Sequence, residues 1–368
     1  MPVEFIGMIG TQNASESRGA TGDPGEIDKS FTSAFARAHE YAGFDRVLIG
    51  YFSFAPDGFQ VAAYAAQQTT RLKFLLAHRP GFVAPTLAAR QLASLDQFSD
   101  GRLAVHIISG GDDAEQARDG DFLSKAERYA RTDDYLDVVK KSWTSSGPFD
   151  HDGPYYKVRG SHAQVRPKQK PRIPIYFGGS SQEAIEVAGK HADVFAFWGE
   201  PLAEAAATIA KVRAAAARHQ REGDIRFSLS LRPILGRTEE EAWARAARIL
   251  EAAKSLTSVY PWPKQAPHAP QNVGSQRLLE AASRGPVLDK RLWTEIAALT
   301  GARGNSTSLV GTPERVAEGM LEYYDIGVTT FLIRGFDPLE DAIEYGRDLI
   351  PIVRAAVARR DGRAAAAE

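Results

Sequence analysis

Short apolar runs alternate with longer amphipathic stretches along most of the chain. The runs are continuously apolar, which is typical of parallel strands that are buried on both faces of a sheet. The predicted strands cover residues 3–9, 46–50, 72–77, 102–108, 173–177, 193–198, 226–235 and 329–336. Helical patterns follow at about 28–42, 57–69, 85–98, 125–143, 181–190, 202–220, 238–254 and 338–359. Eight strand–helix units predict an α/β fold, the closed (β/α)8 or TIM barrel.

Two segments interrupt this alternation. Residues 146–172 are rich in Pro, Gly and aromatic residues, and a second insertion lies within 255–312. We expect all 368 residues to form one barrel domain with these two insertions. Long insertions in barrels are often functional loops, and Gly301 and Gly304 suggest that the second one moves as a substrate lid. The alternative is a solvated excursion without a role.

Composition excludes several classes of function. Hydrophobic residues make up 43% and charged residues 25% of the chain, and the net charge of −1 favours neither nucleic acid nor an anionic membrane as a partner. The absence of cysteine excludes disulfides, Cys-based zinc sites and thiol nucleophiles. No run approaches 18 apolar residues, and the N-terminus lacks a signal-peptide pattern, so we expect a cytoplasmic protein. The spacing of the eight histidines predicts no metal site.

The stretch "IPIYFGGSSQEAIEVAGKHAD", residues 173–193, contains a strand, a glycine turn and the start of a helix. Active sites of barrels lie at the C-terminal ends of the strands, where this turn is expected. Glycines and serines before a helix can form a phosphate-binding cradle. The same residues can also form a simple turn with a serine N-cap. Taken alone, the stretch leaves both interpretations open.

Longer motifs show a resemblance to a known family. They are "RLKFLLAHRPGFVAPTLAARQLASLDQFSDGRLAVHIISGGD", "DGDFLSKAERY", "PIYFGGSS", "WGEP", "ARGNSTSLVG" and "RGFDPLEDA". From about residue 28 to 352 the chain resembles the bacterial luciferase-like flavin monooxygenases, in particular the alkanesulfonate monooxygenase branch. The resemblance implies a barrel that binds reduced FMN from a separate NAD(P)H-dependent flavin reductase and reacts with O2. It also implies an organosulfur substrate, cleavage of a sulfonate to an aldehyde and sulfite, and a homodimer or homotetramer.

The same resemblance assigns cofactor-binding residues. Backbone and hydroxyl groups of the glycine turn, together with a tyrosine, would hold the FMN phosphate, and two residues after the fourth strand would lie beside the ring system. The Ala77–His78 bond corresponds to a non-prolyl cis peptide of this family. His78 would either donate a proton or hydrogen bond near the flavin or serve as a structural histidine. The implied set is Ala77, His78, Ser109, Gly110, Tyr129, Gly178, Gly179, Ser180 and Ser181.

Several positions depart from the pattern of the sulfonate enzymes. Their cysteine after the second strand is missing here, where Ala55 stands nearby, and their active-site tyrosine is replaced by Phe336. Strand seven carries Ser230 and Arg232 in place of an arginine and a histidine, while Trp198 and the mobile-loop arginine are retained. Catalytic candidates are therefore Arg303, Trp198, Arg232 and His78. Substrate-binding candidates are Arg334, Phe336, Ser230 and Phe54.

Arg232, Arg303 and Arg334 could place three guanidinium groups around the flavin. A guanidinium fork suits a sulfonate or a carboxylate, so we expect an anionic organosulfur substrate. The aromatic residues near Phe54 could line a larger cavity or belong to ordinary barrel packing. Two other functions remain open at this point. One is a deazaflavin (F420)-dependent oxidoreductase that transfers hydride without O2, and the other is a flavin-binding barrel without catalytic activity.

Overall fold

The structure is a computed structural model, and it describes residues 2–15, 19–20, 25–256, 270–302, 304 and 306–365. The chain divides into two compact units. The first unit consists of Met1–Val47, Ala196–Ala210 and Arg226–Glu368. The second unit consists of Leu48–Phe195 and Lys211–Ile225.

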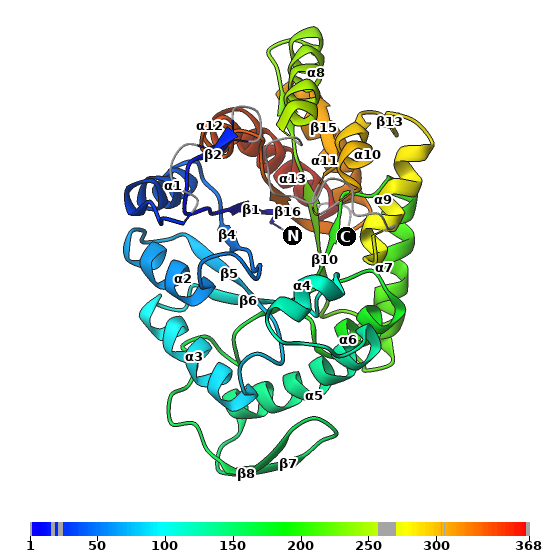
Figure 1. The fold of residues 1–368 in the computed structure, drawn as a ribbon. Helices are drawn as coiled ribbons and strands as arrows, with labels where there is room; N and C mark the ends of the chain where they lie inside the picture. Colours follow the sequence, from blue (N-terminus) through cyan, green and yellow to red (C-terminus); the bar gives the residue numbers. More distant parts are fainter. Residues whose placement is uncertain are drawn as a thin grey trace. The chain divides into compact units, whose positions relative to one another are not determined.

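Eight strands form a closed barrel in the order β1-β16-β11-β10-β9-β6-β5-β4, which confirms the predicted fold class (Figure 1). Each barrel strand coincides with one of the apolar runs in the sequence. Their bounds are β1 Glu4–Met8, β4 Arg46–Ile49, β5 Lys73–His78, β6 Leu103–Ile107, β9 Ile175–Gly178, β10 Val194–Trp198, β11 Arg226–Leu231 and β16 Val328–Ile333.

The predicted strand at 226–235 is the one that differs. It breaks after Leu231, where the Arg232 backbone N–H donates to the Thr307 carbonyl at 3.0 Å. Pro233 has no N–H to continue the ladder. Beyond it, β12 (Ile234–Leu235) pairs with β15 (Ser308–Gly311) in a separate small sheet.

Helices follow the strands as the periodicity predicts. Cap chemistry agrees with the sequence at Thr312, whose hydroxyl accepts from the Arg315 N–H and precedes Pro313 at the first helical position. In the part of the chain that the structure describes, every helix is too short or too polar to span a bilayer.

The helices are α1 Lys29–Tyr41, α2 Gly58–Gln67, α3 Pro85–Phe98, α4 Asp113–Arg118, α5 Lys125–Thr144, α6 Gln182–His191, α7 Leu202–Ala217, α8 Glu239–Leu256, α9 Val273–Ser283, α10 Glu295–Thr300, α11 Pro313–Asp325, α12 Pro338–Glu344, the π-helix Tyr345–Leu349 and α13 Ile350–Ala365.

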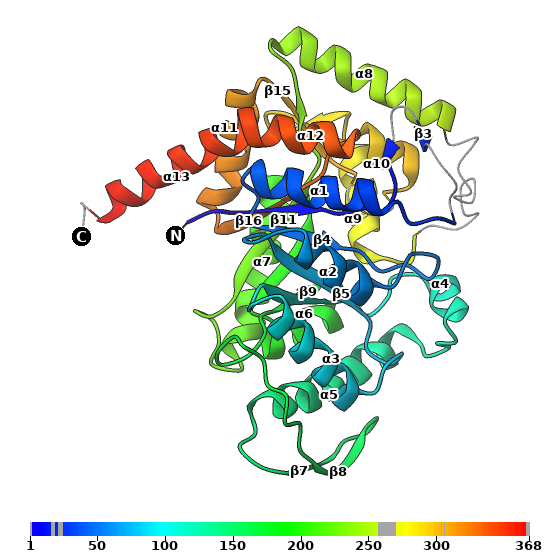
Figure 2. The same cartoon turned by 90° about the vertical axis from the view of Figure 1, so that its left-hand side faces the viewer.

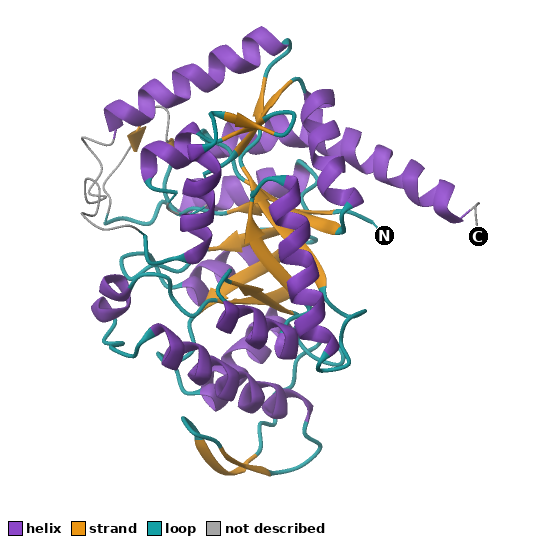
Figure 3. Ribbon diagram, turned by 90° about the vertical axis from the view of Figure 1, so that its right-hand side faces the viewer, coloured by secondary structure: helices purple, strands orange, loops and turns teal. Residues whose placement is uncertain are grey.

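In the second unit, β5, β6 and β9 pair in parallel, and the insertion at 146–172 contains a hairpin. Its strands are β7 (Phe149–Asp152) and β8 (Lys157–Ser161), which extend beyond α5 in Figure 2 and stand as a separate orange pair in Figure 3. The Asp134 carboxylate on α5 fixes the hairpin. It bonds to the His151 imidazole and accepts the backbone N–H groups of Tyr155 and Tyr156, both at 2.8 Å.

In the first unit, the insertion within 255–312 carries regular structure of its own. It supplies α9, α10 and the strands β13 (Val287–Leu288) and β14 (Leu292–Trp293), and β14 pairs with β15. Trp293 and Phe336 belong to the apolar core beneath α8, which runs past β15 in Figure 2. Residues 257–269 lie outside the described residues, so motion of this segment as a lid stays a prediction.

Candidate functional site

The turn from β9 into α6 leaves no space for a side chain at Gly179. Gly179 has φ +142°, a value that side chains disfavour, and a Cβ at this position would lie 2.7 Å from the Ala184 Cβ and 2.9 Å from the Tyr129 hydroxyl oxygen. Ser181 is the N-cap of α6 and accepts from the Ala184 N–H at 3.3 Å. The N-cap interpretation is therefore confirmed, and a helix N-terminus with glycine and serine beside it remains suited to an anion.

Tyr129 joins this turn from α5. Its side chain is 7% exposed, burial raises the pKa of its phenol, and its hydroxyl is hydrogen-bonded to that of Ser181. The phenol is thus protonated at neutral pH and can donate. Glu183 also lies in the first turn of α6, where hydrogen bonds from its own backbone and from Ser181 lower the pKa of its carboxyl group. An anion at this turn would compete with Glu183 for the same donors.

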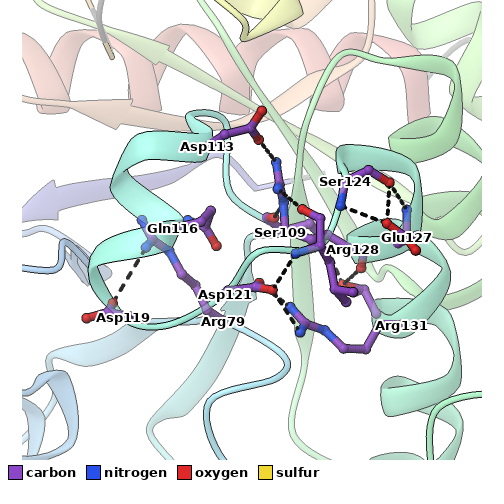
Figure 4. Close-up of polar contacts among 12 residues, drawn as sticks. Arg79, Ser109, Asp113, Gln116, Asp119, Asp121, Ser124, Glu127, Arg128 and Arg131 are labelled. Atoms are coloured by element: carbon purple, nitrogen blue, oxygen red, sulfur yellow. Dashed lines mark hydrogen bonds and ion pairs between the residues drawn. The ribbon is translucent and has the colours of Figure 1, made fainter.

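A second loop of this unit, Ser109–Gly110 after β6, is held by a buried arginine. Arg128, the arginine of the "ERY" motif, is 2% exposed, and its Nε donates to the Ser109 carbonyl at 3.1 Å. The same guanidinium donates to the Leu123 carbonyl and pairs with Asp113 at 2.8 Å. Figure 4 shows Arg128 between Ser109 and Asp113. One side chain therefore ties the loop after β6 to the beginnings of both α4 and α5.

The close packing at Gly110 involves a buried glutamine. Gly110 has φ +81°, and a Cβ there would collide with the amide of Gln116 on α4, which is 1% exposed. The Ser109 hydroxyl lies 2.9 Å from that of Thr132, which itself donates to the Arg128 carbonyl. Hydrogen bonds and steric contact thus restrict the position of this loop.

Two further arginine–carboxylate pairs connect the loops of the second unit, and Figure 4 shows the one between Arg131 and Asp121. Arg79, after β5, pairs with Glu115 on α4 at 2.5 Å, and Arg131 on α5 pairs with Asp121 at 2.5 Å. The Arg131 guanidinium lies where a side chain on Gly81 would be. Sequence reasoning missed all three pairs. The signal was present in the "AHRPGF" and "DGDFLSKAERY" motifs, but their partners are set by the packing of α4.

The structure corrects the expectation for Ala77–His78. Among the described residues, the one cis peptide bond is Lys170–Pro171, so Ala77–His78 is trans. Both residues continue the regular parallel ladder, in which Ala77 lies opposite His106 and His78 opposite Ile107. The Ile108 N–H also donates to the His78 carbonyl at 3.1 Å. A trans bond is consistent with this ladder, because β5 continues without a turn through its last residue, His78.

The His78 side chain is enclosed by aromatic residues. It is 4% exposed, its Nε2 lies 2.7 Å from the Tyr135 hydroxyl, and its ring meets Phe59 edge-on. Burial lowers the pKa of His78 to about 4, so the imidazole is neutral near pH 7. It can therefore exchange a hydrogen bond with Tyr135, but it carries no spare proton as an imidazolium would.

This pKa predicts a pH-dependent stability. Histidine in the unfolded chain titrates near pH 6.5, so between about pH 6.5 and 4 unfolding takes up a proton at His78. Stability should fall as the pH decreases through this window, by up to about 1.4 kcal/mol per pH unit from this one group. In His78→Gln the contribution is absent, so urea unfolding at pH 7, 6 and 5 should give a flatter slope than in wild type. Equal slopes would contradict the shift, because the other buried histidines contribute alike to both proteins.

In the first unit, Trp198 ends β10 and packs against the second insertion. A Cβ on Gly274 of α9 would lie 3.1 Å from the indole, which also packs against Leu278 and Ala302. Glu200 is 1% exposed and pairs with Arg277 of α9 at 2.6 Å. Trp198 therefore borders the base of the insertion. Arg303, the retained arginine of that loop, lies outside the described residues.

Arg232 is enclosed at the β16–α12 turn. Its Cζ lies 3.6 Å from the Phe336 ring centroid, and its Nη2 donates to the Gly335 carbonyl at 2.9 Å. Burial lowers the pKa of Arg232 to about 10. The structure thus brings together two of the predicted site residues, Arg232 and Phe336. Ser230 lies opposite Leu332 in the β11–β16 ladder.

Arg334 and Phe54 occupy different surroundings. Arg334 lines a small pocket with Met8, His39 and Tyr345, its Nη1 lies 3.6 Å from the Met8 sulfur, and burial lowers its pKa. Phe54 belongs to the second unit and is 64% exposed.

One cluster outside these loops has the composition of a metal site. Asp133, Asp137 and His191 place ligand atoms within 4.8 Å of one another. Sequence spacing did not predict it, since the residues come from two helices, α5 and α6. The Lys190 ammonium lies 2.9 Å from both Asp133 and Asp137, so a protein cation already balances the carboxylates. The arrangement is that of an ion-pair network.

Comparison with known families decides the relationship. The model of the family described as "Luciferase-like monooxygenase" matches residues 3–330. The chain belongs to the luciferase-like monooxygenase family. Solved structures of similar fold include EDTA monooxygenase from Chelativorans sp. BNC1, with 18% identity, a TM-score of 0.78 and coverage of 97% of this chain and 94% of that chain.

Two other structures widen the range of chemistry on this fold. Riboflavin lyase shares 20% identity at a TM-score of 0.75, over 97% of this chain and 92% of its own. An F420-dependent secondary alcohol dehydrogenase shares 15% identity at a TM-score of 0.69, over 96% of this chain and 99% of its own. At these identities the likeness establishes the shared fold, and the chemistry of this luciferase-like chain has to be argued from its own residues.

Proposed function

We propose that this protein is a two-component monooxygenase that takes reduced FMN from a separate flavin reductase and uses O2. Its substrate is an anionic organosulfur compound, with a sulfonate first, which it cleaves to an aldehyde and sulfite. Family membership supports the monooxygenase class. The single observation that supports FMN is the β9–α6 turn, where the missing side chain of Gly179 lets the Tyr129 hydroxyl lie against the backbone beside the N-terminus of α6.

The residues at that turn fit a phosphate group. Backbone N–H groups at a helix N-terminus, the Ser180 and Ser181 hydroxyls and the Tyr129 phenol are all donors, as a phosphate dianion requires. Gly178 and Gly179 let the backbone approach the group without a Cβ in the way. Reduced FMN, when bound, would supply the two electrons that O2 activation needs. The protein's part is to hold the phosphate and to keep the Ser109–Gly110 loop in place through Arg128.

Two arginines of the first unit support the proposal of an anionic substrate. Burial lowers the pKa of both Arg232 and Arg334, which means that their charged forms lose hydration in the fold. A negatively charged group bound nearby would recover part of that free energy, and a sulfonate matches the donor geometry of guanidinium. In the net reaction one oxygen atom of O2 enters the aldehyde and the other leaves as water. The sulfonate departs as sulfite.

A second candidate is an F420-dependent oxidoreductase, because one similar fold belongs to an F420-dependent dehydrogenase. Such an enzyme would pass hydride between its substrate and the deazaflavin and would not consume O2. The phosphate cradle alone would serve either cofactor, so an assay has to decide between them.

The test combines the protein with FMN, NADH and a flavin reductase in air and follows sulfite and aldehyde from a panel of sulfonates. We expect equimolar sulfite and aldehyde that depend on both the reductase and O2. A parallel anaerobic assay with F420 and secondary alcohols serves as the control for the second candidate. Reduction of F420 together with no sulfite release in the first assay would overturn the proposal.

A further inference from the structure

The loop after β4 carries four residues, 51–54, in which anchored and exposed residues alternate. The Tyr51 hydroxyl donates to Asp119 at 3.1 Å, and the Ser53 backbone N–H donates to Glu115 at 2.8 Å. Both acceptors belong to α4 or directly follow it. Phe52 and Phe54, between and beyond these anchors, are 41% and 64% exposed. Tyr51 and Ser53 are thus held from α4 and the residue after it, while the Phe52 and Phe54 rings are partly open to solvent.

Further contacts hold Tyr51 and Glu115 in place. Arg79 is 6% exposed, pairs with Glu115 at 2.5 Å and lies over the Tyr51 ring at 4.5 Å from its centroid. Tyr51 also stacks on Phe82, with an angle of 10° between the ring planes. Burial, followed by the hydrogen bond to Asp119, raises the pKa of Tyr51 to about 12, so its phenol stays a donor at neutral pH. These contacts restrict the position of the loop at Tyr51.

The exposed rings are arranged as a stacked pair. The centroids of Phe52 and Phe54 lie 5.3 Å apart with an angle of 16° between the planes, and the Ala55 N–H donates to the Phe52 carbonyl at 3.0 Å. Large apolar side chains at such exposure on a fixed loop are a feature of binding sites. Because Tyr51 and Ser53 already restrict the loop, stacking of a ligand on it would cost less conformational entropy than on a loop without such contacts.

Resting on the function proposed above, we propose that Phe52 and Phe54 form a platform for a planar aromatic ring of the substrate. The substrate class would then be an arylalkyl sulfonate rather than a simple alkanesulfonate. Two rings are far smaller than the roughly 800 Å² per partner that a specific protein interface buries, so a small molecule fits them better than a protein. The platform also shares its support with the predicted cofactor loop, since Glu115 holds Ser53 while the adjacent Gln116 packs on Gly110.

The test is a calorimetric titration with two probes, 2-phenylethanesulfonate and 2-cyclohexylethanesulfonate, with and without added FMN. They match in charge and size but differ in the planarity of the ring. Wild type should bind the phenyl probe about tenfold more tightly than the cyclohexyl probe. The double variant Phe52→Leu/Phe54→Leu should lose that preference. Phe98→Leu, which alters a 90% exposed phenylalanine at the end of α3, should keep it.

Equal affinity for the two probes, no binding of either, or a preference that survives in the double variant would overturn the inference. A change of oligomeric state in the double variant, measured by sedimentation, would also overturn it, because the rings would then form an interface between copies. Binding is measured without turnover, so a lack of sulfite release would count against the proposed function alone. Sulfite release with equal affinity for both probes would count against the platform alone.

Discussion

Replacing Gly179 by alanine should weaken FMN binding by roughly 10- to 100-fold while the protein stays folded. The new Cβ would lie 2.7 Å from the Ala184 Cβ and 2.9 Å from the Tyr129 hydroxyl oxygen. The φ of +142° also disfavours any residue with a side chain, so the turn has to shift. Strain of this kind costs on the order of 1–3 kcal/mol, and each 1.4 kcal/mol corresponds to a factor of ten in affinity.

The measurement is a fluorescence titration with FMN, both oxidised and reduced under anaerobic conditions. Gly285→Ala is the matched control, because Gly285 has a similar φ of +151° with nothing within 4 Å of an added Cβ. It carries the backbone strain without the contact to Tyr129, and its FMN affinity should equal that of wild type. An unchanged affinity in folded Gly179→Ala would remove the β9–α6 turn from the cofactor site.

The barrel could be predicted from the sequence because each of its strands can be recognised from its own run of apolar residues. A buried parallel strand has to be apolar on both faces, so all eight runs stood out without knowledge of their partners. The break after Leu231 was not predictable from that pattern. Apolar residues occur both before the Arg232–Pro233 pair and after it, and the distant Thr307 carbonyl decides where the Arg232 N–H bonds.

The candidate site was predictable in part. Features set by neighbouring residues could be predicted, and contacts between residues distant in the sequence could not. The glycine turn is local, and its N-cap at Ser181 followed from the sequence. The role of Arg128 depends on carbonyls at Ser109 and Leu123, which only the folded loops bring to one guanidinium. The cis bond expected at Ala77–His78 was wrong because it came from resemblance, whereas the β5–β6 ladder sets the bond in this chain.

Arg128→Ala should destabilise the protein strongly, with a loss of roughly 3 kcal/mol in the free energy of unfolding. Removing the guanidinium leaves the Ser109 and Leu123 carbonyls without their donor in a region that is largely buried, and it opens a cavity beside α5. Asp113 is 59% exposed, so water compensates that carboxylate and most of the loss comes from the two carbonyls.

Urea unfolding followed by circular dichroism measures this loss, with Arg90→Ala as the control because Arg90 is an exposed arginine on α3. Arg128→Lys should fall between the two, since an ammonium keeps the charge but cannot reach three acceptors in the geometry of a planar fork. If the Ser109–Gly110 loop belongs to the FMN site, the remaining folded Arg128→Ala protein should also bind FMN more weakly than Arg90→Ala. Stability of Arg128→Ala equal to that of Arg90→Ala would show that the loop after β6 is held by its contact with Gln116 instead.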